Sequence, residues 1–339
     1  MADKLKKTKI KKLAILASGG NAPGMNNVII GFVKVCLFYD IEPILIYEGY
    51  KGLHRGNFKS YNATKLRSLE EFAFRGNVAI QSSRFPEMLK EKVQLEVANQ
   101  IFKNNIDALI VVGGDGSYRG AEKLAKLGVK VVTLPATIDN DVNSTDVTIG
   151  FDSALNQVCR SLSDLIDCFG SHDGVNIVEI MGRDCSDLTV TTGIGNNISH
   201  IVTKENILDM NGFLEVVKKA KANGMKSCSI LITEKIYGKN GLPHLYDVAK
   251  VIEKKTGHLT RYTPIGYIQR GGSPSASDRA LANLMITEAV EMLMDGKYNK
   301  AMCSIANKIV AIDLESAINA TRKSNNKSLV RKFNKINKI

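Results

Sequence analysis

The sequence predicts an α/β protein with two lobes of mostly parallel sheet, each sheet covered by helices on both faces. Three observations predict this class. Apolar runs typical of buried strands alternate with segments of helical periodicity along the chain. The 339 residues exceed the usual size of one domain, and 44% of them are hydrophobic, which excludes a disordered or low-complexity protein. The sequence also shows no internal repeat of solenoid period.

In the first half of the chain, apolar runs that end at or near glycine predict buried parallel strands. These strands are expected at residues 12–20, 42–49, 107–114 and 129–136. Helical spacing of apolar residues predicts helices at residues 24–40 and 88–104, and a short helix is expected before the fourth strand.

The second half continues the alternation. Strands are expected at residues 176–182, 227–234 and 263–272, and helices at residues 152–168, 245–256 and 277–295. Because no Pro- or Ser-rich linker separates the halves, the expected lobe boundary is a chain crossover near Gly150.

Composition excludes several classes of protein. No apolar run approaches the ~20 residues of a membrane span, and no signal-type apolar block follows the basic segment Met1–Lys12. We therefore expect a soluble cytoplasmic protein without membrane association. The six cysteines are widely spaced and the five histidines show no ligand spacing, so we expect reduced thiols and no structural zinc site.

The net charge of +12 is concentrated at the two ends, in KLKKTKIKK and TRKSNNKSLVRKFNKINKI. Such charge can attract nucleic acid, acidic lipid or phosphorylated small molecules, although a solvated lysine-rich surface is the commoner explanation. The sequence carries no nucleic-acid-binding motif, so we expect no specific nucleic-acid partner and favour phosphorylated small molecules.

Loops that carry candidate site residues follow three of the predicted strands, at Ser18–Gly24, Gly113–Ser117 and Pro135–Asp141, and the first two of these loops are rich in glycine. Ligands of open α/β sheets bind beyond the carboxyl ends of the strands. Glycine lets backbone N–H groups approach an anion, and a helix N-terminus adds partial positive charge. Between glycines, Asp115 suits a divalent cation that bridges to phosphate oxygens. Neither GxGxxG nor the Walker pattern is present, which excludes ordinary dinucleotide and P-loop sites.

The segment Thr137-Ile138-Asp139-Asn140-Asp141 is the strongest chemical cluster. In an extended segment, alternation would point Thr137, Asp139 and Asp141 to one side. A lone Asp-x-Asp is usually a turn or a helix N-cap. Beside phosphate-binding loops, however, a carboxylate can accept the proton of an attacking hydroxyl, as the base in phosphoryl transfer.

Together these motifs resemble the bacterial ATP-dependent 6-phosphofructokinases. The resemblance rests on GGNAPGMN, SSRFPE, GGDGSYRGA, TIDND, TIGFDSALN, VEIMGR, ITE and IGYIQRGGSPSASDR, in the family's order over about residues 12–295. It implies two Rossmann-like three-layer α/β lobes in a homotetramer. It also implies transfer of the γ-phosphoryl group of MgATP to the 1-hydroxyl of fructose 6-phosphate in glycolysis.

The resemblance assigns an ATP-binding lobe to residues 1–150 plus about 269–320. There it makes Asp139 the general base with Thr137 beside it, and makes Asp115 the ligand of Mg²⁺. The residues implied to contact the nucleotide are Gly19, Tyr50, Arg84, Phe85, Asp115, Gly116, Ser117 and Gly120. Arg84 and Arg183 would neutralise charge on the transferred group.

The sugar-phosphate lobe is assigned to residues 151–268 plus about 321–339. The implied substrate contacts, besides Thr137 and Asp139, are Met181, Gly182, Arg183, Glu234, Tyr267 and Arg270. Arg261 matches an arginine that reaches a neighbouring subunit's site. Bidentate pairing with phosphate is the physical reason for the arginines.

Several positions depart from the family's pattern. Gly116 and Ala136 differ from the Asp and Lys of the pyrophosphate-using branch, which favours ATP. Gly174 stands where a second cross-subunit arginine is expected, and Tyr267 replaces a histidine. The effector site also lacks most of its charged groups, so classical activation by a nucleoside diphosphate is not expected.

Two alternatives to the working kinase remain. One is a kinase with an altered sugar-phosphate preference. The other is a catalytically weak paralogue that serves as a regulatory or structural subunit in a mixed tetramer.

Overall fold

The computed structural model describes residues 10–321 and 324–337. Within them the chain forms two compact units, and the division falls inside helix α6 (Phe151–Gly170). Unit 1 contains residues up to 153 together with 270–321, and unit 2 contains residues 154–269 together with 324–337. The predicted α/β class is confirmed in both units.

Unit 1 is built on a seven-stranded sheet with the order β11-β10-β5-β4-β1-β2-β3. Its strands are β1 (Lys12–Ala17), β2 (Glu42–Ile46), β3 (Phe58–Ser60), β4 (Ala108–Gly113), β5 (Val131–Pro135), β10 (Lys300–Ile305) and β11 (Lys308–Asp313). Five strands run parallel, and the edge strands β3 and β11 pair antiparallel with their neighbours.

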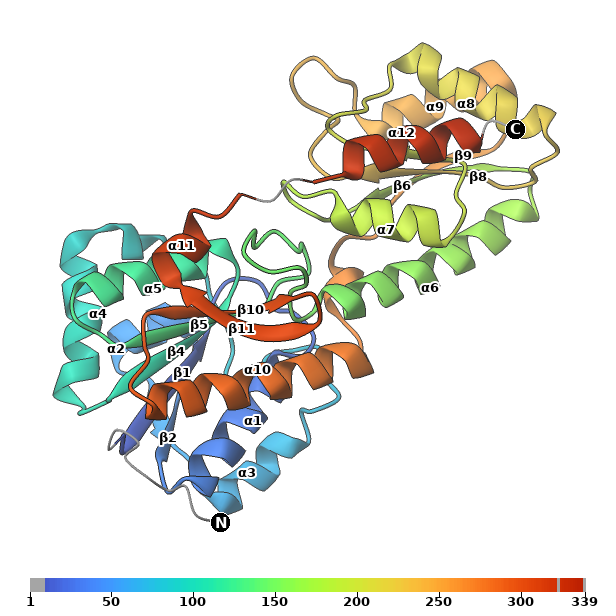
Figure 1. The fold of residues 1–339 in the computed structure, drawn as a ribbon. Helices are drawn as coiled ribbons and strands as arrows, with labels where there is room; N and C mark the ends of the chain where they lie inside the picture. The colour runs from blue at the N-terminus through green and yellow to red at the C-terminus, as the bar shows by residue number, and fades with distance from the viewer. Residues whose placement is uncertain (1–9, 322–323, 338–339) are drawn as a thin grey trace. The chain divides into compact units, whose positions relative to one another are not determined.

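Helices cover both faces of this sheet (Figure 1). They are α1 (Met25–Phe38), α2 (Gly49–Arg55), α3 (Ala63–Glu70), α4 (Glu91–Lys103), α5 (Asp115–Lys126), α10 (Ala276–Met294) and α11 (Leu314–Ile318). On one face, alternate strand residues such as Leu109 and Val111 pack against α2, α4, α5 and α11. On the other face, α1 packs against α10. The central strands are therefore buried on both sides, which explains their continuous apolar runs.

Unit 2 has a four-stranded, fully parallel sheet with the order β7-β8-β6-β9. Its strands are β6 (Val175–Ile180), β7 (His200–Val202), β8 (Cys228–Thr233) and β9 (Thr260–Pro264). The helices α8 (Met210–Ala222) and α9 (Leu245–Thr256) bury an apolar cluster against one face (Figure 1). The helices α7 (Asp187–Gly195) and α12 (Asn326–Ile336) contact each other and β7.

The strand expected at residues 263–272 is largely wrong. Strand β9 ends at Pro264, and Gly266–Arg270 forms a 3₁₀ helix. Proline has no N–H to continue the ladder, and Gly266 has a left-handed backbone with φ of 56°. These two residues end the strand, and Tyr267 consequently lies on a helical turn.

The sequence analysis also assigned no structure to several short elements, among them β10 and β11. These two strands form a hairpin in which Ile305 pairs with Lys308, so only Ala306 and Asn307 form the turn. Both turn residues have positive φ, as a type I′ turn requires. The usual Asn-Gly signal is absent because the first turn residue is alanine, which is rare at such a position.

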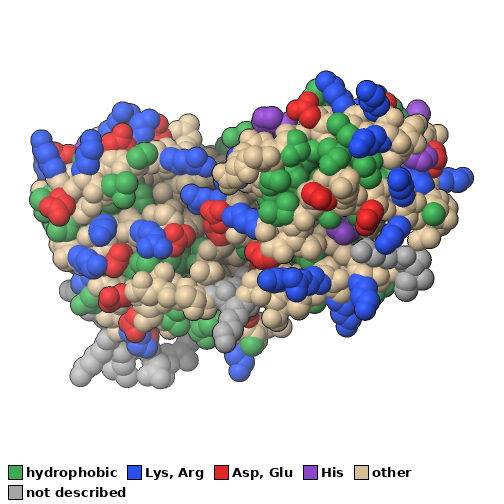
Figure 2. Space-filling view, turned by 90° about the horizontal axis from the view of Figure 1, so that it is seen from above, with side chains coloured by type: hydrophobic (Ala, Val, Ile, Leu, Met, Phe, Trp, Pro, Cys, Tyr) green, Lys and Arg blue, Asp and Glu red, His purple; other side chains and the backbone are tan. Residues whose placement is uncertain are grey.

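Two surface properties bear on partners. None of the described helices is long and apolar enough to cross a membrane. On the face shown in Figure 2, Lys and Arg side chains are scattered among acidic and apolar ones and form no single stripe.

Candidate active site

The two glycine-rich loops and the Pro135–Asp141 loop meet at one edge of the unit 1 sheet, because β1, β4 and β5 are neighbours and parallel. The Ser18 N–H donates to Val112 O at 2.9 Å, and Ser117 Oγ donates to Ser18 O at 3.2 Å. A Cβ at Gly113 would lie 2.4 Å from Ser117 Oγ and 2.6 Å from Ser18 O. The loops after β1 and β4 can pack this closely only because residue 113 is glycine.

Helix α5 begins directly at the second loop, with Asp115 in its first turn. Its N-cap residue is Gly114, which supplies no side-chain cap. Gly116 is exposed, and no described atom lies within 4 Å of the position its Cβ would take. The helix therefore presents an uncapped N-terminus beside open space, the arrangement that favours an anion.

Tyr50 packs against the first turns of α5. Its side chain is 3% exposed, and its hydroxyl donates to Ser117 O at 2.7 Å. Its ring packs where a Cβ of Gly120 would stand, 2.8 Å from the nearest ring atom. Burial raises the pKa of Tyr50. Tyr50, Ser117 and Gly120 thus form one packed group that shapes the first turns of α5.

The segment that carries Arg84 runs beside the first loop. Ser83 forms a bridge with Ser18, and Ser83 O accepts the N–H of Gly19 at 3.3 Å. Gly19 has a left-handed backbone with φ of 91°. Arg84 follows directly and is exposed, so its guanidinium lies in solvent near the first loop. Phe85 turns inward and is half-buried, with its ring 5.5 Å from that of His54.

Asp115 forms an ion pair with Arg119 one turn along α5, with Oδ2 and Nε 2.9 Å apart. This hydrogen bond raises the pKa of Arg119. Both side chains are about half exposed, so the pair is weak and can exchange for another partner. In the described part of the chain, no group of three or more His, Cys, Asp or Glu side chains could hold a metal ion. A single accessible carboxylate fits Mg²⁺ only if phosphate oxygens complete its coordination.

The segment Thr137–Asp141 is not extended, so the predicted alternation is wrong. Residues 138 and 139 form a turn, and Asn140 has a left-handed φ of 53°. The Asp139 N–H donates to Thr137 Oγ1 at 3.2 Å, a local bond that bends the backbone. Thr137 and Asp139 are each 7% exposed, at the rim of the third loop. A Cβ at Gly114 would lie 3.6 Å from Thr137 Cβ, which places this loop against the start of α5.

Asn140 fixes the shape of this turn. Its Oδ1 accepts the N–H of Thr148 at 3.0 Å, and its Nδ2 donates to Asp146 O at 3.2 Å. The Thr148 hydroxyl in turn donates to Thr137 O at 2.6 Å. Thr137 and Asp139 therefore lie on a loop that is held by hydrogen bonds to Asp146 and Thr148, six to eleven residues further along the chain.

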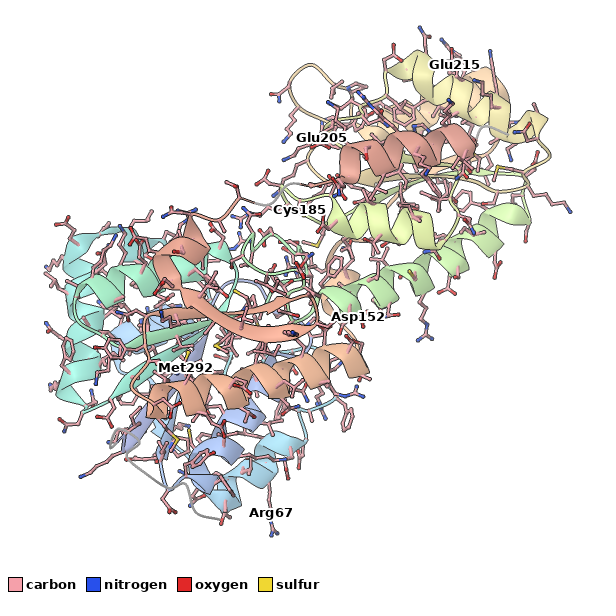
Figure 3. The ribbon with its side chains drawn as sticks, viewed as in Figure 1. Arg67, Asp152, Cys185, Glu205, Glu215 and Met292 are labelled. Atoms are coloured by element: carbon pink, nitrogen blue, oxygen red, sulfur yellow. The ribbon has the colours of Figure 1, made fainter. Side chains whose placement is uncertain are left out.

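In unit 2, the loop after β6 carries Met181, Gly182 and Arg183. The N–H groups of Gly182 and Arg183 donate to Glu234 Oε1 at 3.3 and 2.7 Å. Cys185, labelled in Figure 3 just ahead of α7, donates its N–H to Gly182 O at 2.8 Å. This brings Met181, Gly182, Arg183 and Glu234 together, as their shared assignment to one site requires.

The surroundings of three other predicted residues are as follows. Arg261 on β9 is exposed and pairs with Glu253 Oε2 at 2.6 Å. Tyr267 is 84% exposed on the 3₁₀ helix. Arg270 belongs to unit 1, where its Nη1 donates to Asn21 O at 3.1 Å and lies 2.8 Å from the position of a Cβ on Gly20. Arg270 therefore lies at the first glycine loop.

Asn26, which anchors the segment before Arg84, could not be identified from the sequence patterns. Asn26 is 1% exposed on α1. Its Nδ2 donates to the carbonyl oxygens of residues 72, 75 and 77, and its Oδ1 accepts the N–H of Ala79. The only available signal was an asparagine pair in an otherwise apolar helix, MNNVIIGF.

Comparison with known proteins identifies relatives along nearly the whole chain. A family model described as phosphofructokinase matches residues 12–293. The chain is 38% identical over 324 residues to a probable ATP-dependent 6-phosphofructokinase of Malacoplasma penetrans, covering 96% of this chain and 99% of that protein. It is 42% identical over 309 residues to an ATP-dependent 6-phosphofructokinase of Teredinibacter turnerae, covering 91% and 94%.

Solved structures show the same fold. A Pichia pastoris phosphofructokinase in the T-state has a TM-score of 0.85 and 28% identity; the match covers 98% of this chain but only 40% of the longer yeast chain. A pyrophosphate-dependent phosphofructokinase from Marinobacter aquaeolei has a TM-score of 0.79 at 19% identity, covering 97% and 91%, and this likeness concerns the fold alone.

Proposed function

The chain belongs to the phosphofructokinase family, and from this premise we propose that it transfers the γ-phosphoryl group of ATP to fructose 6-phosphate. The products are fructose 1,6-bisphosphate and ADP, and the reaction serves glycolysis in the cytoplasm. The observation that carries this proposal is the meeting of the Ser18–Gly24, Gly113–Ser117 and Pro135–Asp141 loops at the uncapped N-terminus of α5.

ATP binds to unit 1. The open space at Gly116 receives the nucleotide phosphates, and Gly19, Ser117 and Gly120 shape the surrounding loops. The accessible Asp115 would hold Mg²⁺, and the ion would supply positive charge to the nucleotide phosphates. ATP is favoured over pyrophosphate because Gly116 leaves room, whereas an Asp at this position would repel a phosphate.

The acceptor is the 1-hydroxyl of the sugar phosphate. Asp139 accepts the proton of this hydroxyl as its oxygen attacks the γ-phosphorus, and Thr137 orients the reacting group. The bond between the γ-phosphorus and the bridging oxygen breaks, and ADP leaves. Arg84 and Arg183 offset the negative charge on the transferred group.

The sugar phosphate is held by Met181, Gly182, Glu234 and Tyr267 of unit 2, with Arg270 as a cation for its phosphate. Arg261 completes a neighbouring subunit's site in a homotetramer. The change of the expected arginine to Gly174 removes one phosphate contact, so we expect a KM for fructose 6-phosphate raised by roughly ten- to a hundredfold.

Steady-state ADP production by the purified protein with MgATP, across fructose 6-phosphate concentrations, tests this proposal. The variants Asp139→Asn and Asp139→Ala should lower kcat by about 10²- to 10⁴-fold. Asp164→Asn, which changes an exposed carboxylate on α6, should leave kcat unchanged and serves as the control. Absence of turnover above the Asp139→Ala background, even at tens of millimolar sugar phosphate, would contradict the proposal.

A further inference from the structure

The loop Met181–Arg183 is held by side chains from two distant segments. The Met181 N–H donates to Gln269 Oε1 at 3.0 Å, and the next two N–H groups donate to Glu234 Oε1. Glu234 follows β8 and Gln269 follows β9, and these strands flank β6 in the sheet. Three successive N–H groups of one loop are thus satisfied by two side chains of unit 2, so these side chains determine the path of the loop.

The backbone of this loop is tightly constrained. Arg183 has a left-handed φ of 55°, which is uncommon for a residue with a side chain. A Cβ at Gly182 would lie 2.4 Å from Cys185 O. Such a conformation persists only where the surroundings impose it. The two acceptor side chains hold the loop at its start and at its end.

Gln269 is an unusual residue for its position. Its side chain is 0% exposed, and within the described residues its Nε2 has no hydrogen-bond partner. A buried polar group without a partner destabilises the fold, and methionine would fill a similar volume without that penalty. The acceptor that Oε1 offers to the Met181 N–H is the contact that accounts for an amide here.

We propose that Gln269 is a positioning residue for the acceptor sugar phosphate. Its Oε1 fixes the first N–H of the loop, and through the loop it sets the direction in which Arg183 leaves the backbone. Because Gln269 is fully buried, it acts through Met181 and Arg183 and touches no substrate. This inference rests on the proposed function for its kinetic effect, although the contact itself does not.

The structure separates the roles of the two anchoring residues. Glu234 is partly exposed, with 20% of its side chain accessible, so it can contact the sugar as well as hold the loop. Gln269 can only hold the loop. Loss of Gln269 should therefore affect sugar-phosphate binding and leave ATP binding unchanged, since the ATP loops belong to unit 1.

Gln269→Met removes the acceptor at similar side-chain volume. We expect the KM for fructose 6-phosphate to rise about tenfold, with the KM for ATP and the thermal midpoint unchanged or the midpoint slightly higher. Gln157→Met makes the same chemical change at a half-buried position on α6 and should alter neither KM. A general loss of structure would instead lower the midpoint and raise both KM values, which would overturn the inference.

Gln269→Glu provides the conservative variant, because it keeps an acceptor oxygen at the same place. Burial raises the pKa of a carboxyl group, and the neutral acid has nearly the shape of the amide. The ratio of the KM of this variant for fructose 6-phosphate to that of the parent should therefore approach one as the pH falls from about 8 to 6. A ratio equal to that of Gln269→Met at every pH would contradict the role of Oε1.

Amide hydrogen exchange gives a readout that does not depend on the reaction. In Gln269→Met, exchange at Met181 should be at least tenfold faster than in the parent, while exchange in the β4 strand of unit 1 stays constant. Unchanged exchange at Met181 would overturn the positioning role even in an active enzyme. If the parent is inactive but exchange at Met181 is faster in Gln269→Met than in the parent, the proposed function alone is overturned and the contact remains established.

Discussion

Gly113 at the end of β4 and Gly116 in the first turn of α5 have opposite surroundings although they are three positions apart. A Cβ at Gly113 would lie 2.4 Å from Ser117 Oγ and 2.6 Å from Ser18 O of the neighbouring loop. At Gly116, by contrast, no described atom lies within 4 Å of that position. The same change to alanine at each glycine therefore separates an effect on folding from an effect on the nucleotide.

Gly113→Ala should destabilise unit 1, because added volume in a close-packed site costs about 1–3 kcal/mol. For a unit of this size, that lowers the thermal midpoint by about 2–12 °C. Gly116→Ala replaces a poor helix former in the first turn of α5, so stability should stay constant or rise by up to about 1 kcal/mol.

For ATP binding we expect the opposite, with the larger effect from Gly116→Ala. If the nucleotide phosphates occupy the space at Gly116, a methyl group there weakens their approach to the N–H groups of α5, and the KM for ATP should rise about tenfold or more. Calorimetry and initial-rate kinetics on both variants measure the two effects. A Gly116→Ala enzyme with unchanged KM for ATP would refute our placement of the phosphates. A Gly113→Ala protein as stable as the parent would refute the close packing of the loops.

Two further predictions concern stability. Asp278 is 1% exposed and accepts hydrogen bonds from the N–H groups of Gly150 and Ser153 and from the Ser153 hydroxyl. Asp278→Ala should therefore lower the free energy of unfolding, measured by urea denaturation, by about 3 kcal/mol. A loss below about 1 kcal/mol would contradict this prediction. Asp173 hydrogen-bonds to Lys221, which holds its pKa below the ordinary value of 3.8. The stabilisation from this ion pair is therefore present above about pH 4 and is lost as the pH falls through the lowered pKa. The unfolding free energies of the parent and of Asp173→Asn should differ at pH 7 and converge in acid. A difference that does not depend on pH would refute the ion pair.

The parts of the molecule that could be predicted from the sequence depend on local patterns. The strands β1, β4 and β5 are buried on both faces, so each is a continuous apolar run, and a loop with candidate site residues follows it. Parallel neighbours place such loops at one edge. The meeting of these loops at one edge of unit 1 could therefore be predicted before any contact was known.

The contacts that could not be predicted join residues far apart in the chain. Asn26 bonds to residues about fifty positions away, and Gln269 bonds to Met181 across 88 positions. Neither bond alters the local periodicity, because each depends on which loops the sheet order brings together. The bend at Thr137–Asp141 could not be predicted for a related reason, since the bonds from Asn140 to Asp146 and from Thr148 to Thr137 add to the local bond between Asp139 and Thr137.

The surroundings of Gly174 give a physical reason why glycine, and not the expected arginine, stands at this position. Its N–H donates to Phe169 O at 2.9 Å, and a Cβ at this position would lie 2.8 Å from the Phe169 ring and 3.2 Å from Leu259 O. Lys221 Nζ donates to the carbonyl oxygens of Asp173 and Gly174 at 2.8 and 3.3 Å and closes the turn from the other side.

An arginine at residue 174 would therefore require movement of the Phe169 ring and of the backbone at Leu259. One substitution at Gly174 could not restore this cation without strain. Under the proposed function, the phosphate of the acceptor relies on the remaining arginines and on the geometry of the Met181–Arg183 loop. We therefore expect the anchoring of that loop by Gln269 to matter more in this chain than it would with a full set of phosphate ligands.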